Sequence, residues 1–311
     1  MFDVVIVGGG PAGLSAALML GRCRRQVLVC DSGHPRNAAS AAMHNFLTRD
    51  GTPPEEFLRI GREQLQPYPS VEYRSIEVID AERVADHFEV LLADESRVNA
   101  RTLLLATGLV DLLPPLEGIE QFYGKSVFQC GYCHGWEVRD LPLIIYGRGQ
   151  MALVTALQLT TWSRDIVLCS NGPCELERRD LIKLAIHRIK VCETEIKRLE
   201  GNGSQLERVV FDDDLFLPCR AMFCATQPRQ TKLYEKFAHT PFPPTATPIQ
   251  LPLAPGVYAA GDAYFGRWVA GAVASGAEVA VMIHSTLLEE DLQAEARSVA
   301  TSGTIRHPFQ H

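Results

Sequence analysis

The sequence predicts an α/β fold made of two three-layer units, with the second unit inserted into the first. Two glycine-rich turns, each between an apolar strand and a helix, lie about 140 residues apart in the chain. Proline-rich stretches at 112–118 and 241–256 separate the middle of the chain from its two ends. A further strand and helix follow the second stretch, so the two ends have the elements to form one unit together.

Length and composition fit this prediction. The 311-residue chain has room for about two domains, and 46% apolar with 22% charged residues is typical of a protein with sizeable cores. The net charge of −7 offers no basic surface for nucleic acid or for an anionic membrane. No apolar run reaches the roughly 20 residues that span a bilayer. Asp3 interrupts the first apolar run and no basic region precedes it, so we expect no export signal and a cytoplasmic protein.

The first element is the continuous apolar run at 2–8, typical of a strand buried on both faces. A helix is expected at 14–22 and a second strand at 26–31, with G-x-G-x-x-G between the first strand and the helix. Glycines there permit a tight turn and the close approach of a pyrophosphate, whose charge the helix N-terminus stabilises. An acid about 20 residues further on can bind ribose hydroxyls. The pattern predicts a dinucleotide site at Gly8, Gly10, Pro11, Ala12, Gly13 and Asp31.

The pattern repeats in the middle of the chain. An apolar strand at 141–147 leads into G-x-G-x-x-A at 147–152, a helix at 152–162 and a strand at 165–169. Two such units predict two Rossmann-like domains.

The connectors set the expected domain boundaries. We expect 1–112 and 250–311 to form one domain and 113–249 the inserted one. After the second connector, the sequence predicts a strand near 256–260 and a helix at 267–288 whose small residues would pack closely.

The stretch Cys130-Gly131-Tyr132-Cys133-His134 is C-x-x-C-H, which fits attachment of a c-type haem, half of a zinc site, or a redox dithiol. Haem attachment follows export, and no export signal is expected. Zinc needs two further ligands, and the remaining cysteines of the middle segment lie on apparent strands or at their ends, where a small buried apolar role is the simpler account. We therefore expect no metal site. These cysteines are Cys169, Cys174, Cys192, Cys219 and Cys224.

Together these motifs resemble the low-molecular-weight thioredoxin reductase family of FAD flavoenzymes, over nearly the whole chain. The stretches at 44–59 and 130–140 are more specifically similar to a branch that includes bacterial homologues and fungal dithiol oxidases. The resemblance rests on the first glycine loop with Asp31, the PRN at 35–37, the ATG at 106–108, the C-x-x-C at 130–133 and the YAAGDA at 258–263.

The resemblance implies roles for individual residues. FAD would lie on the first glycine loop, Cys133 would be the sulfur next to the flavin, and Cys130 would exchange with a partner. His134 stands where the common reductases carry an acid/base Asp, and its ordinary pKa near 6.5 suits proton transfer. Further cofactor contacts are expected from Arg36, Asn37, Asn45, Thr107, Gly108, Gly261, Asp262, Trp268 and Val269.

Two departures from the family pattern argue against NADPH as electron donor. The stretch at 169–175 lacks the basic cluster that holds a 2′-phosphate, and Arg148 is bulky where a phosphate would lie. The C-terminal tail carries Phe309 and His307, and an aromatic side chain there would stack over the flavin where nicotinamide binds in other members.

The resemblance thus implies an FAD-dependent disulfide/dithiol oxidoreductase that passes electrons between FAD, Cys130–Cys133 and a partner. The expected partner is a thioredoxin-like protein or a small dithiol or disulfide, the expected donor is ferredoxin or another non-NADPH reductant, and the expected assembly is a homodimer. The direction of electron flow is open. The alternatives are a conventional NADPH-dependent thioredoxin reductase, a dithiol oxidase running in reverse, and a non-catalytic flavin-binding sensor.

Overall fold

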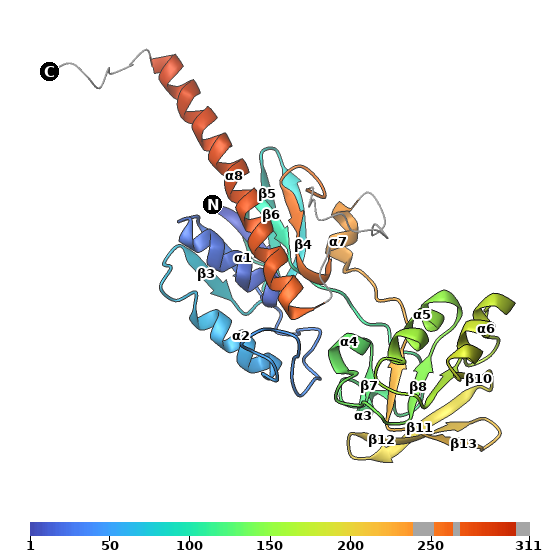
Figure 1. The fold of residues 1–311 in the computed structure, drawn as a ribbon. Coiled ribbons are helices and arrows are strands. Elements are labelled where there is room, and N and C mark those ends of the chain that lie inside the picture. The colour runs from blue at the N-terminus through green and yellow to red at the C-terminus, as the bar shows by residue number, and fades with distance from the viewer. Residues whose placement is uncertain (239–251, 264–267, 303–311) are drawn as a thin grey trace. The chain divides into compact units, whose positions relative to one another are not determined.

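The computed structural model describes residues 1–238, 252–263 and 268–302 (Figure 1). It is a mixed α/β structure with parallel sheets, as predicted, and its contacts divide the chain into two compact units. The first unit comprises Met1–His34, Leu58–Gly108 and the described chain from Gln230 onward; the second comprises Pro35–Phe57 and Leu109–Arg229.

The first unit is built on a seven-stranded sheet in the order β3-β2-β1-β6-β5-β4, with β15 paired to β6. Strands β4 and β5 are antiparallel to their neighbours, and the other strands are parallel. Its elements are β1 (Phe2–Val7), α1 (Pro11–Arg22), β2 (Val27–Cys30), α2 (Pro54–Glu63, which begins in the second unit's segment), β3 (Val71–Arg74), β4 (Val78–Val84), β5 (His87–Leu92), β6 (Arg97–Leu105), α7 (Lys232–Phe237), β15 (Val257–Ala259), the 3₁₀ turn η1 (Gly261–Ala263) and α8 (Val269–Ser302).

The apolar runs that predicted strands are the core strands of this sheet. Four consecutive residues of β1, from Val4 to Val7, are buried, as expected for a strand covered on both faces. Helix α7 adds Leu233 and Tyr234 to the same core. The apolar side chains of α7 are buried in the core of the first unit. The chain accordingly returns to the first unit at Gln230, about 20 residues before the boundary at 250 that the sequence predicted. The boundaries drawn from the sequence stay a prediction.

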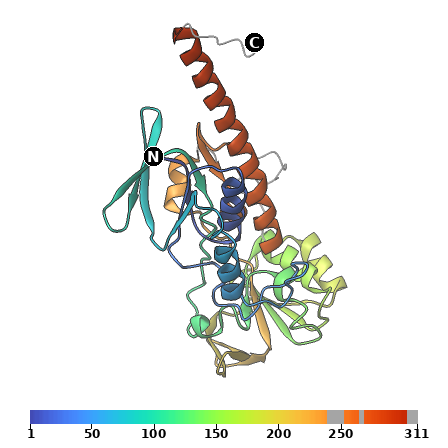
Figure 2. The same cartoon turned by 90° about the vertical axis from the view of Figure 1, so that its left-hand side faces the viewer.

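Helix α8 packs against α1, as the small residues of its sequence predicted (Figure 1). A Cβ on Gly276 would lie 2.1 Å from the carbonyl oxygen of Ala12, so only glycine permits this approach. The Ser15 hydroxyl donates to the Val273 carbonyl at 2.7 Å. The helix runs beyond 288, where the sequence placed its end, to Ser302 (Figure 2). By length and composition it could cross a membrane, but its first half packs on α1 as a core helix does.

The second unit contains a parallel five-stranded sheet, β10-β9-β8-β14-β7, and an antiparallel three-stranded sheet, β11-β12-β13. Its elements are α3 (Ile119–Phe122), β7 (Val127–Phe128), α4 (Gly131–His134), β8 (Leu143–Tyr146), α5 (Gly149–Leu159), β9 (Ile166–Cys169), α6 (Arg178–Ile186), β10 (Lys190–Cys192), β11 (Ile196–Asn202), β12 (Gln205–Phe211), β13 (Phe216–Pro218) and β14 (Ala221–Cys224).

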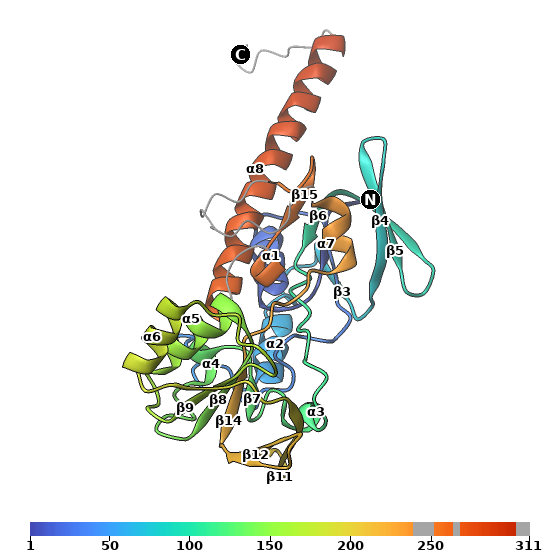
Figure 3. The same cartoon turned by 90° about the vertical axis from the view of Figure 1, so that its right-hand side faces the viewer.

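These elements form three layers around the parallel sheet. One face of the sheet packs on α5 and α6, with Leu153 and Leu184 in that core. The other face packs on the antiparallel sheet, with Leu199 and Val209 in a second core (Figure 3). The sheet thus holds the glycine turn after β8 and the short helix α4 after β7 in fixed positions within this unit.

Candidate functional site

The first glycine turn has the shape of an anion cradle. Gly8 has φ +108°, and a Cβ there would lie 2.3 Å from the carbonyl oxygen of Ala106. A Cβ on Gly13 would lie 1.9 Å from the carbonyl oxygen of Gly8. Within the described chain, no backbone acceptor pairs with the N–H groups of Gly10, Ala12 or Gly13. Free N–H groups at a helix N-terminus are suited to bind a phosphate.

Asp31 follows β2 and lies against this turn, where the sequence predicted a ribose-binding acid. A Cβ on Gly9 would lie 2.8 Å from the Asp31 side chain. The Tyr73 hydroxyl donates to Asp31 Oδ2 at 2.7 Å. Burial, and then this hydrogen bond, raise the pKa of Tyr73 to about 12, so the phenol stays a donor and orients the carboxylate. The second carboxylate oxygen remains available to a ribose hydroxyl.

Two more loops reach the same edge of the sheet, because parallel strands share their carboxyl ends. Thr107 and Gly108 follow β6, and Gly261 with Asp262 follow β15. Gly261 has φ +70°, and its N–H donates to the Ser275 hydroxyl at 3.0 Å. Across this edge the loops stand in the order β2, β1, β6, β15. Ligands of open parallel sheets bind at such an edge. The glycine cradle, the free N–H groups and the acid together fit a dinucleotide such as FAD.

The remaining predicted cofactor residues of the first unit lie at the start of α8 and in the C-terminal tail. Trp268 is 44% exposed just before α8, and Val269 begins that helix. Phe309 and His307 lie outside the described residues.

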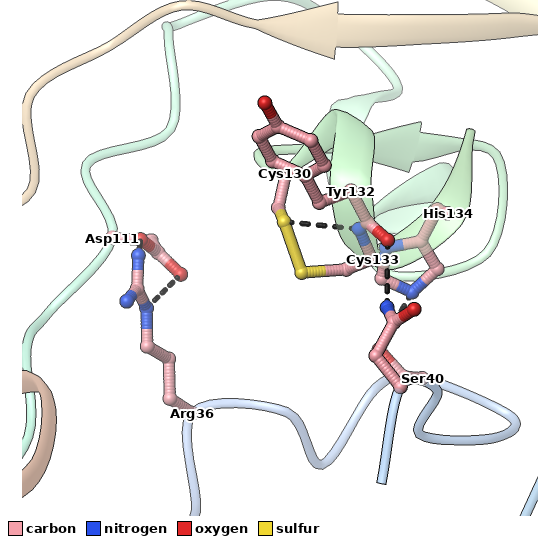
Figure 4. Close-up of a disulfide and its surroundings, with 8 residues drawn as sticks. Arg36, Ser40, Asp111, Cys130, Tyr132, Cys133 and His134 are labelled. Atoms are coloured by element: carbon pink, nitrogen blue, oxygen red, sulfur yellow. Dashed lines mark hydrogen bonds and ion pairs between the residues drawn. A yellow bond between two sulfur atoms is a disulfide. The ribbon is translucent and has the colours of Figure 1, made fainter. Parts of the chain in front are cut away.

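The redox pair is joined as a disulfide at the start of α4 in the second unit (Figure 4). Cys130 is the N-cap residue, and its sulfur accepts a hydrogen bond from the Cys133 N–H at 3.1 Å. Two glycines let this short helix lie close to Trp162. A Cβ on Gly135 would lie 2.6 Å from that ring, and one on Gly131 would lie 3.1 Å from the Leu159 side chain. Gly131 therefore serves close packing, which the sequence could not show.

His134 is held at the end of α4 by a ring stack on Phe128, with centroids 4.3 Å apart and planes 12° apart. Its Nε2 lies 3.5 Å from the Ser40 hydroxyl, and its buried Nδ1 has no hydrogen-bond partner within the part of the chain that the structure describes. Burial, and then the nearby His44, lower the pKa of His134 to about 4, while the backbone of Cys130 acts in the opposite sense. At neutral pH the imidazole is therefore uncharged, and it is a weaker proton acceptor than the histidine with the ordinary pKa near 6.5 that was expected from the sequence.

Residues of the segment 35–57 contact this helix and the turn after it, and the segment belongs to the same compact unit. The Asn45 amide donates to the Tyr132 carbonyl at 2.8 Å, from a backbone with φ +64°. The two ring nitrogens of His44 lie 3.4 Å from Glu137 and 3.5 Å from Asp50. The sequence placed Asn45 near a flavin; its contact to the redox helix was missed because the segment has no periodic pattern that predicts packing.

Arg36, also predicted to contact the cofactor, binds Asp111 through two hydrogen bonds of 2.6 and 3.0 Å (Figure 4). The Tyr123 hydroxyl donates to the same carboxylate at 2.5 Å. Asn37 closes a turn by accepting the Ser40 N–H at 3.0 Å through its backbone carbonyl. The cofactor roles of Arg36, Asn37 and Asn45 stay predictions.

The second glycine turn differs from the first because protein atoms fill it. The Gly149 N–H, a group that would bind a phosphate, donates instead to the Cys174 carbonyl at 2.9 Å. Arg148 donates through Nε to the Ser170 carbonyl at 2.8 Å and through Nη2 to the Asn171 carbonyl. Its guanidinium also lies 3.8 Å from Glu175. The loop 170–175 therefore folds over the N-terminus of α5.

The other cysteines of this unit are buried in its core or line it. Burial raises the pKa of Cys219 and Cys224 to about 12, and that of Cys169 further. Among the residues described, no cluster of three or more His, Cys, Asp and Glu side chains is arranged to hold a metal ion.

Comparison with known proteins identifies relatives of the whole chain. The family model for pyridine nucleotide-disulphide oxidoreductases matches residues 2–280. The crystal structure of HlmI has a TM-score of 0.91 at 33% identity, covering 97% of this chain and 98% of that one. An oxidoreductase from Agrobacterium tumefaciens has a TM-score of 0.84 at 32% identity, covering 92% and 98%.

Curated sequences give shorter matches. The thioredoxin reductase tcpT of Claviceps purpurea is 39% identical over 180 residues, which are 55% of this chain and 56% of that protein. The chain spans about half the length of the curated relatives that it matches.

Proposed function

Because the chain belongs to the pyridine nucleotide-disulphide oxidoreductase family, we propose that it is an FAD-dependent disulfide/dithiol oxidoreductase of the thioredoxin reductase type that works without a pyridine nucleotide. The proposal that no pyridine nucleotide takes part rests on one observation: protein atoms fill the second glycine turn.

The first glycine turn and Asp31 would hold FAD in the first unit, the turn at its pyrophosphate and the acid at its adenosine ribose. The loops after β6 and β15 would hold the rest of the cofactor. When bound, FAD supplies an acceptor or donor of two electrons. In the first unit, the task of the protein is to place that group and to keep Tyr73 protonated as the donor that orients Asp31.

The second glycine turn has no place for a dinucleotide phosphate in its present arrangement. A phosphate would compete with the Cys174 carbonyl for the Gly149 N–H, and with two backbone carbonyls for the Arg148 guanidinium. Each displaced hydrogen bond costs about 1 kcal/mol net, more if a buried group is left unpaired. In addition, the stretch 169–175 has no basic side chain to bind the 2′-phosphate of NADPH.

The Cys130–Cys133 disulfide would exchange with a partner. In the oxidising direction, a partner thiolate attacks Cys130, the S–S bond to Cys133 breaks, and a second partner thiolate completes a new disulfide. Two electrons and two protons pass to the cysteine pair. The neutral His134 beside the pair can accept one of those protons. Closing of the dithiol would restore the disulfide and release two electrons, for which FAD, when bound, would be the acceptor.

Steady turnover tests this proposal. Holoprotein with dithiothreitol and oxygen should oxidise the dithiol and yield one peroxide for each disulfide formed, if the chain acts as a dithiol oxidase. In the reductase direction, reduced ferredoxin should drive reduction of an oxidised thioredoxin under anaerobic conditions. Cys133→Ser should abolish either activity while FAD stays bound. Absence of turnover in both directions would favour the sensor alternative and contradict the proposal.

A further inference from the structure

The structure places one unpaired acceptor beside the predicted cofactor loops of the first unit. It is Oε1 of Gln230, a buried atom that has no hydrogen-bond partner among the residues that the structure describes. Gln230 is the first residue of the chain as it re-enters the first unit from the second. Leaving a buried acceptor unpaired costs roughly 1–3 kcal/mol, so such atoms are rare in native structures and call for a missing donor.

The neighbours of Gln230 show which loops it joins. Its Nε2 donates to the carbonyl of Ala263 at 2.8 Å, directly after Asp262. The next residue, Thr231, lies with its hydroxyl 3.1 Å from that of Thr107. Residues 230 and 231 thus join the two loops, Gln230 to the loop that follows β15 and Thr231 to the loop that follows β6. With Nε2 committed to Ala263, the direction of Oε1 is fixed.

The order of the strands assigns this place to one half of a bound dinucleotide. Asp31 stands at the end of β2 and the glycine turn at the end of β1. An adenosine ribose on Asp31 and a pyrophosphate on the turn leave the ends of β6 and β15 for the remaining half. For FAD that half is the ribityl chain and the isoalloxazine ring. It carries the hydroxyl and N–H donors that an orphaned acceptor lacks.

We infer that Gln230 is a cofactor-positioning residue whose Oε1 accepts a hydrogen bond from the ribityl–isoalloxazine half of bound FAD. The inference rests on the proposed use of FAD. The sequence had placed position 230 in the inserted domain, since the proline-rich stretch that marks the connector begins only at 241.

Equilibrium binding to the flavin-free protein tests the inference without any measurement of activity. Gln230→Met keeps the length of the side chain and removes the acceptor. The dissociation constant for FAD should rise roughly 5- to 10-fold, the effect of one net hydrogen bond. The dissociation constant for ADP, which lacks the flavin half, should not change. Gln66→Met, an exposed glutamine of the same unit, should change neither constant.

The outcomes separate this inference from the proposed function. If the wild-type protein does not bind FAD, the proposed function fails. If it binds FAD and Gln230→Met binds FAD equally well, only the role of Gln230 is refuted. If the dissociation constants for FAD and ADP rise by the same factor, Gln230 stabilises the whole binding site and makes no specific contact with the flavin half, so the inference is also refuted. The midpoint temperature of unfolding of the flavin-free variant should be close to that of the wild type. The loss of the hydrogen bond to Ala263 is offset by removal of a buried acceptor that is unpaired among the described residues.

Discussion

The Nε atom of Arg148 lies 2.8 Å from the carbonyl oxygen of Ser170, so a side chain of the second glycine turn binds the end of the adjacent strand. In the first turn the corresponding space is bordered by Asp31 and by N–H groups without a backbone acceptor in the described chain. The two turns share a sequence pattern and differ in what fills them. This difference is the basis for proposing that one turn binds a dinucleotide and the other does not.

Replacing Arg148 should loosen the loop over α5. Arg148→Ala removes hydrogen bonds to two backbone carbonyls, and we expect it to lower the free energy of unfolding by about 1–2 kcal/mol. Chemical denaturation measures this directly. Arg179→Ala is the matched control, because Arg179 forms an exposed ion pair with Glu177 and should change stability by less than about 0.5 kcal/mol. Equal effects of the two substitutions would show that Arg148 does not hold the loop.

His134 should make stability depend on pH. Its pKa is about 4 in the folded protein and near 6.5 when unfolded, so the unfolded chain binds more protons between these values. The stability due to the neutral ring is complete above about pH 6.5 and is lost as pH falls toward 4, by up to about 3 kcal/mol.

The comparison of wild type with His134→Phe isolates this effect. Phenylalanine can stack on Phe128 but does not titrate, so the difference in unfolding free energy between the two proteins should change across pH 4–6.5. A difference that stays constant across this range would mean that His134 is not buried as a neutral ring. His187→Asn, at an exposed histidine, should leave the pH profile unchanged.

Asn45 should help to hold the redox helix. Both Asn45→Gly and Asn45→Ala lose the bond to the Tyr132 carbonyl, and alanine also bears a cost of roughly 1 kcal/mol at φ +64°. We expect both variants to be reduced faster by dithiothreitol than wild type, and Asn45→Ala to be the less stable of the two. Unchanged reduction rates in both would mean that this contact does not restrain the disulfide.

Alkylation of native protein should find a single redox pair. Cys30, Cys169, Cys174, Cys219 and Cys224 are buried, so the oxidised protein should label only at the half-buried Cys23 and Cys192. Reduction should add two labelled positions, which peptide mapping should assign to Cys130 and Cys133. A gain of four thiols on reduction would reveal a second disulfide and contradict this description.

Much of the first unit could be predicted from the sequence, because its backbone turns require particular residue types at particular positions. Gly8 and Gly13 have no room for a side chain, and Asp31 must follow a buried strand. The strands at 2–8 and 26–31 were likewise confirmed as β1 and β2.

Contacts between segments far apart in the chain could not be predicted in the same way. The sequence marked Arg148 as too bulky for a phosphate site, but it did not indicate that the guanidinium would bind Ser170 and Asn171. Residues 35–53 have no helical or strand periodicity, so their contacts with α4 depend on tertiary structure alone. Gln230 lies before the proline-rich connector, and the burial of α7 together with the hydrogen bond to Ala263 shows that it belongs to the first unit.

The most direct test of the central claim is to mix the oxidised holoprotein with excess NADPH, and separately NADH, under anaerobic conditions while recording the flavin absorbance. We predict that neither nucleotide bleaches the flavin within the time in which dithiothreitol bleaches it through Cys130 and Cys133. Rapid bleaching by NADPH would contradict the account and would identify a conventional NADPH-dependent thioredoxin reductase.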